Sequence, residues 1–349
     1  MVRKLFVSAC MAAAMFAGSA QADVTLNGAG ATFPKPMYDK FVQEYTATHP
    51  DVKINYSSVG SGAGIKQISE QTVDFGGTDA PMTDKQLSAA KGGAIYHIPT
   101  VMGAVVPIYN LPGVEKPVNF SGPVIADIYL GKITSWDDAR IAALNEGVKL
   151  PAKAISVVHR SDGSGTTAIF TDYLAKVSPE WAAGPGRGTA IKWIDNSLGG
   201  KGNEQVAAIV QKTEGAIGYV ELIFAANNKI AFGNVQNSAG KFVTASLEGV
   251  SASAAGLKEI PADMRMSITN ADGEASYPIS GLTWVLVYEN QKDAAKGQAL
   301  VNFLWWATHG GQSLAGDMHY APLPKALLPT IEAKLTSIKA DGKVIEPQK

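Results

Sequence analysis

Three short segments rich in Gly, Ser and Thr each run into a predicted helix, and they are Gly28–Pro34, Gly60–Gly64 and Asp162–Thr167. The first N–H groups of a helix lack intrahelical partners and carry partial positive charge, and glycines let the backbone approach an anion closely. One such segment alone is more often an ordinary helix cap. Three of them in one chain predict that they converge on a shared anion.

The third segment carries the strongest signal, because it follows a predicted strand that ends in His159-Arg160. A guanidinium at the end of a strand, just before a helix N-terminus, offers a planar fork of donors to an oxoanion. Asp162 lies two residues further on and is placed to orient that guanidinium. The alternative is a surface Arg–Asp pair of little energetic value, and the residues alone do not decide between the two. His159 is expected on the opposite face of the strand.

The sequence lacks the motifs of common enzyme classes. A nucleophile elbow needs Gly two residues before its Ser, but Asp162 stands before Ser164 and Val59 before Ser61. The dinucleotide fingerprint and the P-loop are also missing. The five histidines are scattered without metal-ligand spacing, so we expect neither a metal site nor a cofactor.

Predicted strands and helices alternate along the chain, which indicates an α/β fold with mostly parallel sheets. Residues 184–204 are expected to form an irregular excursion, and the pair Trp305-Trp306 is expected to pack in the core. The expected strands are 52–57, 73–75, 155–158 and 216–220, and the expected helices are 37–45, 64–71, 167–176, 221–226 and 294–306.

The first 22 residues have the pattern of a secretory signal peptide. Arg3 and Lys4 precede the apolar run Leu5–Ala17, which is too short to span a membrane, and Ala20-Gln21-Ala22 forms a cleavage signal. The single cysteine, Cys10, lies inside this segment, and a lipoprotein box around it is the alternative. We therefore expect a cleaved, cysteine-free protein in the periplasm.

The chain has 349 residues, which favours at least two domains. Lys and Arg total 30 against 31 Asp and Glu. Removing Arg3 and Lys4 with the signal leaves 28 against 31, a net charge of −3. Nucleic-acid binding requires a basic excess or stripe, so a nucleic-acid partner is not expected.

Taken together, the motifs resemble the periplasmic phosphate-binding proteins of high-affinity phosphate ABC importers. The resemblance extends from Leu26 to about Pro324. It is carried by the segments Gly28–Pro34, Val73–Pro81, Asp127–Asp138, Arg160–Thr166, Gly215–Val220 and Tyr320–Pro324.

The resemblance implies a two-lobed periplasmic binding protein fold of type II, an α/β fold with mixed or mostly parallel sheets, flanking helices and a ligand cleft between the lobes. One lobe would comprise residues 23–107 and 284–349, and the other residues 108–283. The matched positions imply phosphate ligation by Thr32, Phe33, Ser61, Asp79, Arg160, Asp162, Ser164, Gly165 and Thr166.

Among these residues, Asp79 implies selectivity for phosphate over sulfate. A carboxylate is unfavourable beside an anion unless the ligand brings a proton, and phosphate brings one whereas fully ionised sulfate does not. An Asx-type turn at Asp79 is the structural alternative.

The resemblance further implies a monomer, not an enzyme, that closes on inorganic phosphate and delivers it to an inner-membrane phosphate ABC permease. The alternatives are a receptor for another tetrahedral oxoanion, a secreted phosphatase that uses Ser61 or Ser164 as nucleophile, and an adhesin or signalling protein that uses phosphate structurally.

Overall fold

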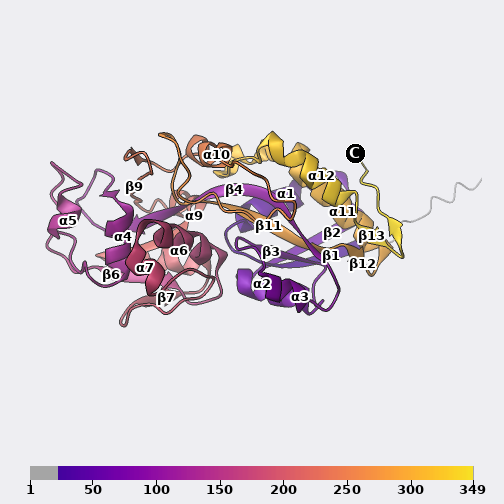
Figure 1. Cartoon of the computed structure of the whole chain (residues 1–349), viewed down its shortest axis with the longest axis horizontal. Helices are drawn as coiled ribbons and strands as arrows, with labels where there is room; N and C mark the ends of the chain where they lie inside the picture. The colour runs from indigo at the N-terminus through magenta and orange to yellow at the C-terminus, as the bar shows by residue number, and fades with distance from the viewer. Residues whose placement is uncertain (1–22, 349) are drawn as a thin grey trace, which may run out of the picture.

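The computed structural model describes residues 23–348 and shows an elongated molecule in which two groups of elements lie end to end (Figure 1). The first group combines the N-terminal and C-terminal parts of the chain. Its elements are β1 (Val24–Gly30), α1 (Lys35–Thr48), β2 (Val52–Ser58), α2 (Ser61–Ser69), β3 (Phe75–Thr78), α3 (Asp84–Ser88), β12 (Asn290–Gln291), α11 (Ala294–Thr308), α12 (Leu328–Leu335), β13 (Lys339–Ala340) and β14 (Lys343–Val344), with short 3₁₀ helices at 310–314, 316–318 and 325–327.

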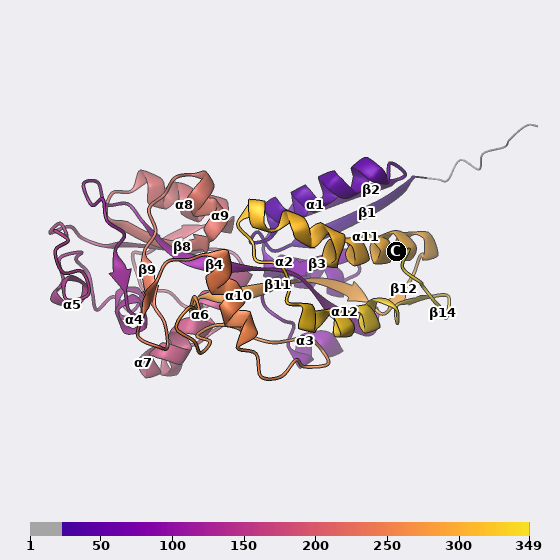
Figure 2. The same ribbon diagram turned by 90° about the horizontal axis from the view of Figure 1, so that it is seen from above.

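The second group is formed by the middle of the chain. Its elements are β5 (Asn119–Phe120), α4 (Gly122–Tyr129), α5 (Ala139–Ala142), β6 (Ser156–Arg160), α6 (Gly165–Val177), α7 (Pro179–Ala183), β7 (Leu198–Gly200), α8 (Gly202–Lys212), β8 (Ala216–Glu221), α9 (Leu222–Asn227), β9 (Asn234–Gln236) and β10 (Phe242–Val243). Two long strands, β4 (Ile95–Tyr109) and β11 (Ser280–Tyr288), and the helix α10 (Leu247–Ala255) lie between the groups (Figures 1 and 2).

One eight-stranded sheet runs through both groups in the order β2-β1-β3-β11-β4-β8-β6-β7. The outer strands pair in parallel on each side, whereas β11 is antiparallel to β3 and β4, and β4 is antiparallel to β8. Nearly every residue of β4 and β11 is buried, as expected for strands covered on both faces. The expectation of a mixed or mostly parallel α/β fold is confirmed.

Most of the expected helices and strands are present within a few residues of their predicted bounds. Helix α1 buries Met37, Phe41 and Tyr45 on one face, as its spacing predicts. The expected core packing of the two tryptophans is only partly right, because both remain half-buried. The Trp306 ring meets the Phe41 ring edge to face, with 5.8 Å between centroids, and Trp305 stacks on His309.

The expected irregular excursion over residues 184–204 is right up to residue 197 and wrong beyond it. Strand β7 begins at Leu198 and pairs in parallel with β6, and α8 begins at Gly202. Gly202 has φ of +74°, a left-handed conformation that glycine adopts without penalty, so the chain turns sharply from strand to helix. The glycines of residues 184–204 therefore belong partly to an irregular loop and partly to β7 and the tight turn between β7 and α8.

The predicted signal segment 1–22, with Cys10, lies outside the described residues. Among residues 23–348, no helix is both long and apolar enough to cross a bilayer. The division into lobes 23–107 plus 284–349 and 108–283 stays a prediction, and it corresponds to the two groups of elements separated in Figure 2.

Candidate functional site

One side of the site is formed where strands of the first group end. Thr32 and Phe33 lie between β1 and α1, Ser61 is the first residue of α2, and Asp79 directly follows β3. Because β1, β2 and β3 run parallel, their carboxyl ends meet at one edge of the sheet, which is where ligands bind in such sheets. All four residues are buried.

The other side is formed at the end of β6 and the start of α6. Arg160 is the last residue of β6, and Ser164 is the N-cap of α6, where its Oγ accepts the N–H of Thr167 at 3.0 Å. Gly165 and Thr166 then form the first turn of α6. The anion-binding end of this helix therefore lies beside the guanidinium of Arg160.

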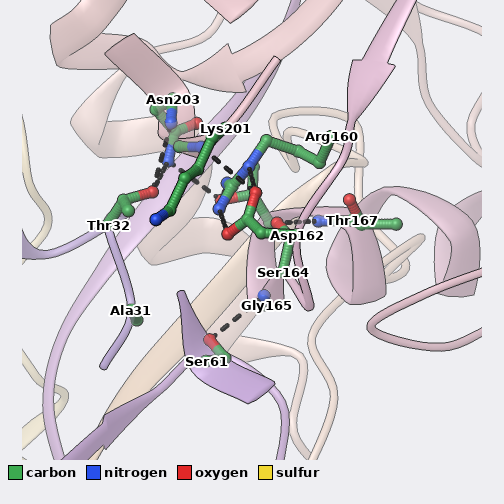
Figure 3. Close-up of polar contacts among 12 residues, drawn as sticks. Ala31, Thr32, Ser61, Arg160, Asp162, Ser164, Gly165, Thr167, Lys201 and Asn203 are labelled. Atoms are coloured by element: carbon green, nitrogen blue, oxygen red, sulfur yellow. Dashed lines mark hydrogen bonds and ion pairs between the residues drawn. The ribbon is translucent and has the colours of Figure 1, made fainter. Parts of the chain in front are cut away.

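The two sides touch each other directly (Figure 3). Gly165 N–H donates to Ser61 Oγ at 3.1 Å, and Gly62 N–H donates to the carbonyl of Gly163 at 2.9 Å. The structure therefore brings together the residues that the sequence predicted, although more than eighty positions separate Asp79 from Arg160 along the chain. In this arrangement the two sides are closed on each other.

Arg160 and Asp162 form the bidentate pair that the sequence suggested. Nε donates to Oδ1 at 2.8 Å and Nη2 donates to Oδ2 at 2.6 Å, while Nη1 donates to Thr166 Oγ1 at 3.4 Å. The alternative of a surface pair is wrong, because the Arg160 side chain is 1% exposed. Burial raises the pKa of Asp162, but the hydrogen bond and charge of Arg160 outweigh it and hold that pKa below its usual range. Asp162 thus stays ionised and fixes the plane of the guanidinium.

Asp79 is a buried carboxyl group with one free oxygen. Its Oδ1 accepts the hydroxyl of Thr283 at 2.8 Å, whereas Oδ2 has no hydrogen-bond partner among residues 23–348. Burial raises the pKa of Asp79 to about 7, against the lowering effects of Thr283, Arg160 and Ser61. A buried polar atom without a partner is costly, so Oδ2 is poised to accept a hydrogen from a ligand.

Ser61 is fixed as a hydrogen-bond donor by its surroundings. Its Oγ accepts two backbone N–H groups, those of Asp79 at 3.2 Å and Gly165 at 3.1 Å. A hydroxyl oxygen has two lone pairs, and here both are used. The Ser61 hydrogen is therefore left to donate, which suits an anion.

Phe33 is completely buried and anchors the start of α1. Its ring packs edge to face on Tyr320, with 6.1 Å between centroids, and its carbonyl accepts the Tyr320 hydroxyl at 2.5 Å. The predicted use of the Phe33 N–H as a donor to the ligand stays a prediction.

Residues absent from the sequence prediction also belong to the site. Thr283, on β11, holds Asp79, and Asn203, on α8, donates to Thr32 Oγ1 at 2.7 Å. Thr283 lies inside a strand, where no local signal identifies it. Asn203 directly follows the Gly-rich turn over residues 199–202 at the start of α8, and that turn is the signal that could have identified it. His159 faces away from these residues as expected, since its ring stacks on Trp193 at 4.9 Å.

A cavity of about 560 Å³ opens beside Asp79. Its wall combines residues 79–83 and 280–282 and Trp284 with residues 168–169, 172, 187–188, 263 and 265–269. Within the part of the chain described by the structure, no cluster of three or more His, Cys, Asp or Glu side chains is placed to hold a metal ion.

Comparison with known proteins agrees with this geometry. The model of the PBP superfamily domain matches residues 17–308. Phosphate-binding protein PstS of Xylella fastidiosa is 44% identical over 312 residues, covering 89% of this chain and 84% of that protein. The PstS of Pasteurella multocida is 42% identical and covers 95% of both chains. The chain belongs to the PstS family of phosphate-binding proteins.

Solved structures agree with this family's fold. A high-affinity periplasmic phosphate-binding protein bound with phosphate superposes with a TM-score of 0.74 at 20% identity, covering 89% of this chain and 93% of that one. The phosphate-binding protein from Stenotrophomonas maltophilia gives a TM-score of 0.68 at 21% identity, over 89% of this chain and 93% of its own. At these identities the likeness establishes the shared periplasmic-binding-protein-like fold.

Proposed function

We propose that this protein binds inorganic phosphate between its two sides and delivers it to a membrane ABC permease for import. The observation that carries the proposal is Asp79 Oδ2, a buried acceptor that has no hydrogen-bond partner within residues 23–348, in the same site as the guanidinium of Arg160. An anion that also carries a hydrogen satisfies both groups. Phosphate does so at neutral pH, and the relatives at 41–44% identity are named phosphate-binding proteins.

The remaining ligands follow from the geometry. Arg160 has five N–H donors, of which the hydrogen bonds to Asp162 and Thr166 use three, so two remain for phosphate oxygens. The Ser61 hydroxyl and the N–H of Thr166 supply further donors, whereas the N–H groups of Gly165 and Thr167 in the same turn already donate to Ser61 Oγ and Ser164 Oγ. The proposed phosphate ligands are Thr32, Phe33, Ser61 and Asp79 on one side and Arg160, Ser164, Gly165 and Thr166 on the other, with Asp162 holding Arg160.

Ligand binding and lobe closure are linked in this proposal. Only when the lobes 23–107 plus 284–349 and 108–283 are together do both sets of ligands reach one anion, so phosphate stabilises the closed form. The closed form, acting as a monomer in the periplasm, then presents its surface to the inner-membrane permease. No chemical change of phosphate is required.

The arrangement around the serines supports binding rather than hydrolysis. Both lone pairs of Ser61 Oγ accept backbone N–H groups, and Ser164 Oγ caps α6. Among the described residues, Ser164 Oγ is bonded to no His, Asp or Glu side chain that would act as its base, and the carboxyl beside Ser61, that of Asp79, is held by Thr283. A nucleophilic serine needs such a base, so the phosphatase alternative lacks support.

Phosphate uptake tests the proposal in cells that lack this gene. Complementation with the wild-type gene is expected to restore uptake of labelled phosphate, and Arg160→Met is expected to abolish it. Arg140→Met is the matched control, because Arg140 forms the same bidentate pair with Asp138 at 3.0 and 2.9 Å on an exposed surface. Uptake that persists with Arg160→Met, or turnover of a chromogenic phosphomonoester by the purified protein, would overturn the proposal.

A further inference from the structure

Asn203 is a completely buried amide that joins the two sides of the cleft (Figure 3). Its Nδ2 donates to Thr32 Oγ1 at 2.7 Å and to Thr166 Oγ1 at 3.1 Å, and its backbone N–H donates to Thr32 Oγ1 at 3.2 Å. Thr32 lies in the first group of elements, and Asn203 and Thr166 lie in the second. One side chain therefore contacts a hydroxyl on each side of the proposed phosphate site.

The orientation of this amide is determined by a backbone group. Asn203 Oδ1 accepts the N–H of Glu221 at 3.1 Å, and a backbone N–H can only donate. The carbonyl oxygen of the amide must therefore face Glu221, which leaves the NH₂ group facing the two threonines. The direction of the hydrogen bonds between Asn203 and the threonines follows from this single contact.

The amide in turn determines what the two hydroxyls do. Thr32 Oγ1 accepts both the side-chain and the backbone N–H of Asn203, so its two lone pairs are occupied. Thr166 Oγ1 accepts from Asn203 Nδ2 and, at 3.4 Å, from Arg160 Nη1, so its lone pairs are occupied as well. Each hydroxyl keeps one function, which is to donate its own hydrogen.

We propose that Asn203 is the positioning residue that makes Thr32 and Thr166 obligatory hydrogen-bond donors to the bound anion and that ties the two sides together when they close. This inference rests on the proposed phosphate function, which it deepens. Obligatory donors favour a ligand with several acceptor oxygens. The bond between Asn203 and Thr32 also adds a contact across the cleft that exists only in the closed arrangement.

Replacing the amide tests the inference directly, with phosphate-stripped protein and inorganic phosphate in a calorimeter. Asn203→Ala removes the donors from the side chain and is expected to weaken phosphate binding roughly 10-fold, as for one hydrogen bond to a charged group. Asn203→Asp keeps the shape but turns a donor into an acceptor, so both hydroxyls donate to the new carboxylate. We expect it to weaken binding by more than about 100-fold.

Asn145→Asp is the matched control, because Asn145 is also buried and bonded through both ends of its amide, to Asn119 and Ile141 outside the site. Each variant is first checked for a cooperative thermal transition. A protein that folds and binds phosphate as tightly with Asn203→Asp as without it would overturn the inference. Absence of phosphate binding by the wild type would instead overturn the proposed function.

A double-mutant cycle with Thr32→Val separates positioning from simple packing. If Asn203 acts through Thr32, then Asn203→Ala costs clearly less phosphate affinity in the Thr32→Val background than in the wild type. Equal losses in both backgrounds would show that the two residues act independently, and this result would also refute the inference. The cycle remains informative even if Asn203→Asp does not fold, because it uses only the two milder variants.

Discussion

Replacing Asp79 by Asn is predicted to remove the discrimination between phosphate and sulfate. In the wild type, Oδ1 accepts the Thr283 hydroxyl, and the free Oδ2 is buried beside Ser61 and Gly165. In Asp79→Asn the carbonyl oxygen keeps the bond from Thr283, so the NH₂ group takes the place of Oδ2. A site that accepted a ligand hydrogen then donates one, which satisfies sulfate.

The expected loss of discrimination between phosphate and sulfate is large, because Asp79 accepts a hydrogen from the ligand and the amide in Asp79→Asn would donate one. Sites that pair with a substrate hydrogen reject analogues that lack it by as much as about 10⁴–10⁵-fold. Since burial leaves Asp79 3% exposed, water does not relieve a mismatch there. We predict that the ratio of the sulfate Kd to the phosphate Kd falls by at least about 100-fold in Asp79→Asn.

The pH dependence of sulfate binding gives an independent measure of the same contact. Sulfate fits the wild-type site only when Asp79 carries a proton, and burial places the pKa of that group at about 7. Sulfate affinity should therefore rise as the pH falls, about tenfold per unit above pH 7, and level off below it. In Asp79→Asn the affinity should not change over this range.

Calorimetric titration with phosphate and with sulfate between pH 6 and 9 measures both effects. Asp74→Asn serves as the control, because Asp74 binds Lys296 and the N–H of Asn27 outside the site. An unchanged sulfate-to-phosphate ratio in Asp79→Asn, or a sulfate affinity of the wild type that does not vary with pH, would refute the role assigned to Asp79.

Two further predictions concern the closed geometry. Gly165→Ala is expected to abolish phosphate binding while the protein still folds, because a Cβ there would lie 2.5 Å from both Asp79 Oδ2 and Ser61 Oγ. Gly188→Ala is the control for calorimetry and melting, since the nearest atom to a Cβ at that position lies 3.6 Å away. Phosphate binding retained by Gly165→Ala would contradict the closed geometry. Arg160→Lys is expected to weaken phosphate binding by about 10–100-fold, because an ammonium loses the bidentate pair with Asp162. Equal phosphate Kd values for the wild type and Arg160→Lys would contradict the role given to this pair.

The sequence predicts the parts of the site that are formed locally. Gly-, Ser- and Thr-rich turns before helices place Thr32, Ser61 and Ser164 correctly, and the i, i+2 spacing of Arg160 and Asp162 predicts their ion pair. These features depend on helix termini and on neighbouring residues, so a short window of sequence is enough to identify them.

The parts that remain hidden depend on contacts between distant segments. Asn203 meets Thr32 across 171 positions, and Thr283 meets Asp79 across 204. The second contact arises because β11 pairs with β3, and the first arises where the start of α8 meets the turn before α1. No periodicity or local motif encodes these contacts. The residues that orient the ligand groups therefore become visible only in the folded chain.

The central claim is that one phosphate is held by both sides of the closed cleft. Titration of phosphate-stripped protein at neutral pH, first with phosphate and then with sulfate, tests it most directly. We predict tight binding of one phosphate per chain and much weaker binding of sulfate, which weakens further as the pH rises above the Asp79 pKa of about 7. Comparable binding of sulfate would contradict the role of Asp79, and the absence of heat with phosphate would contradict the assignment of this site to phosphate.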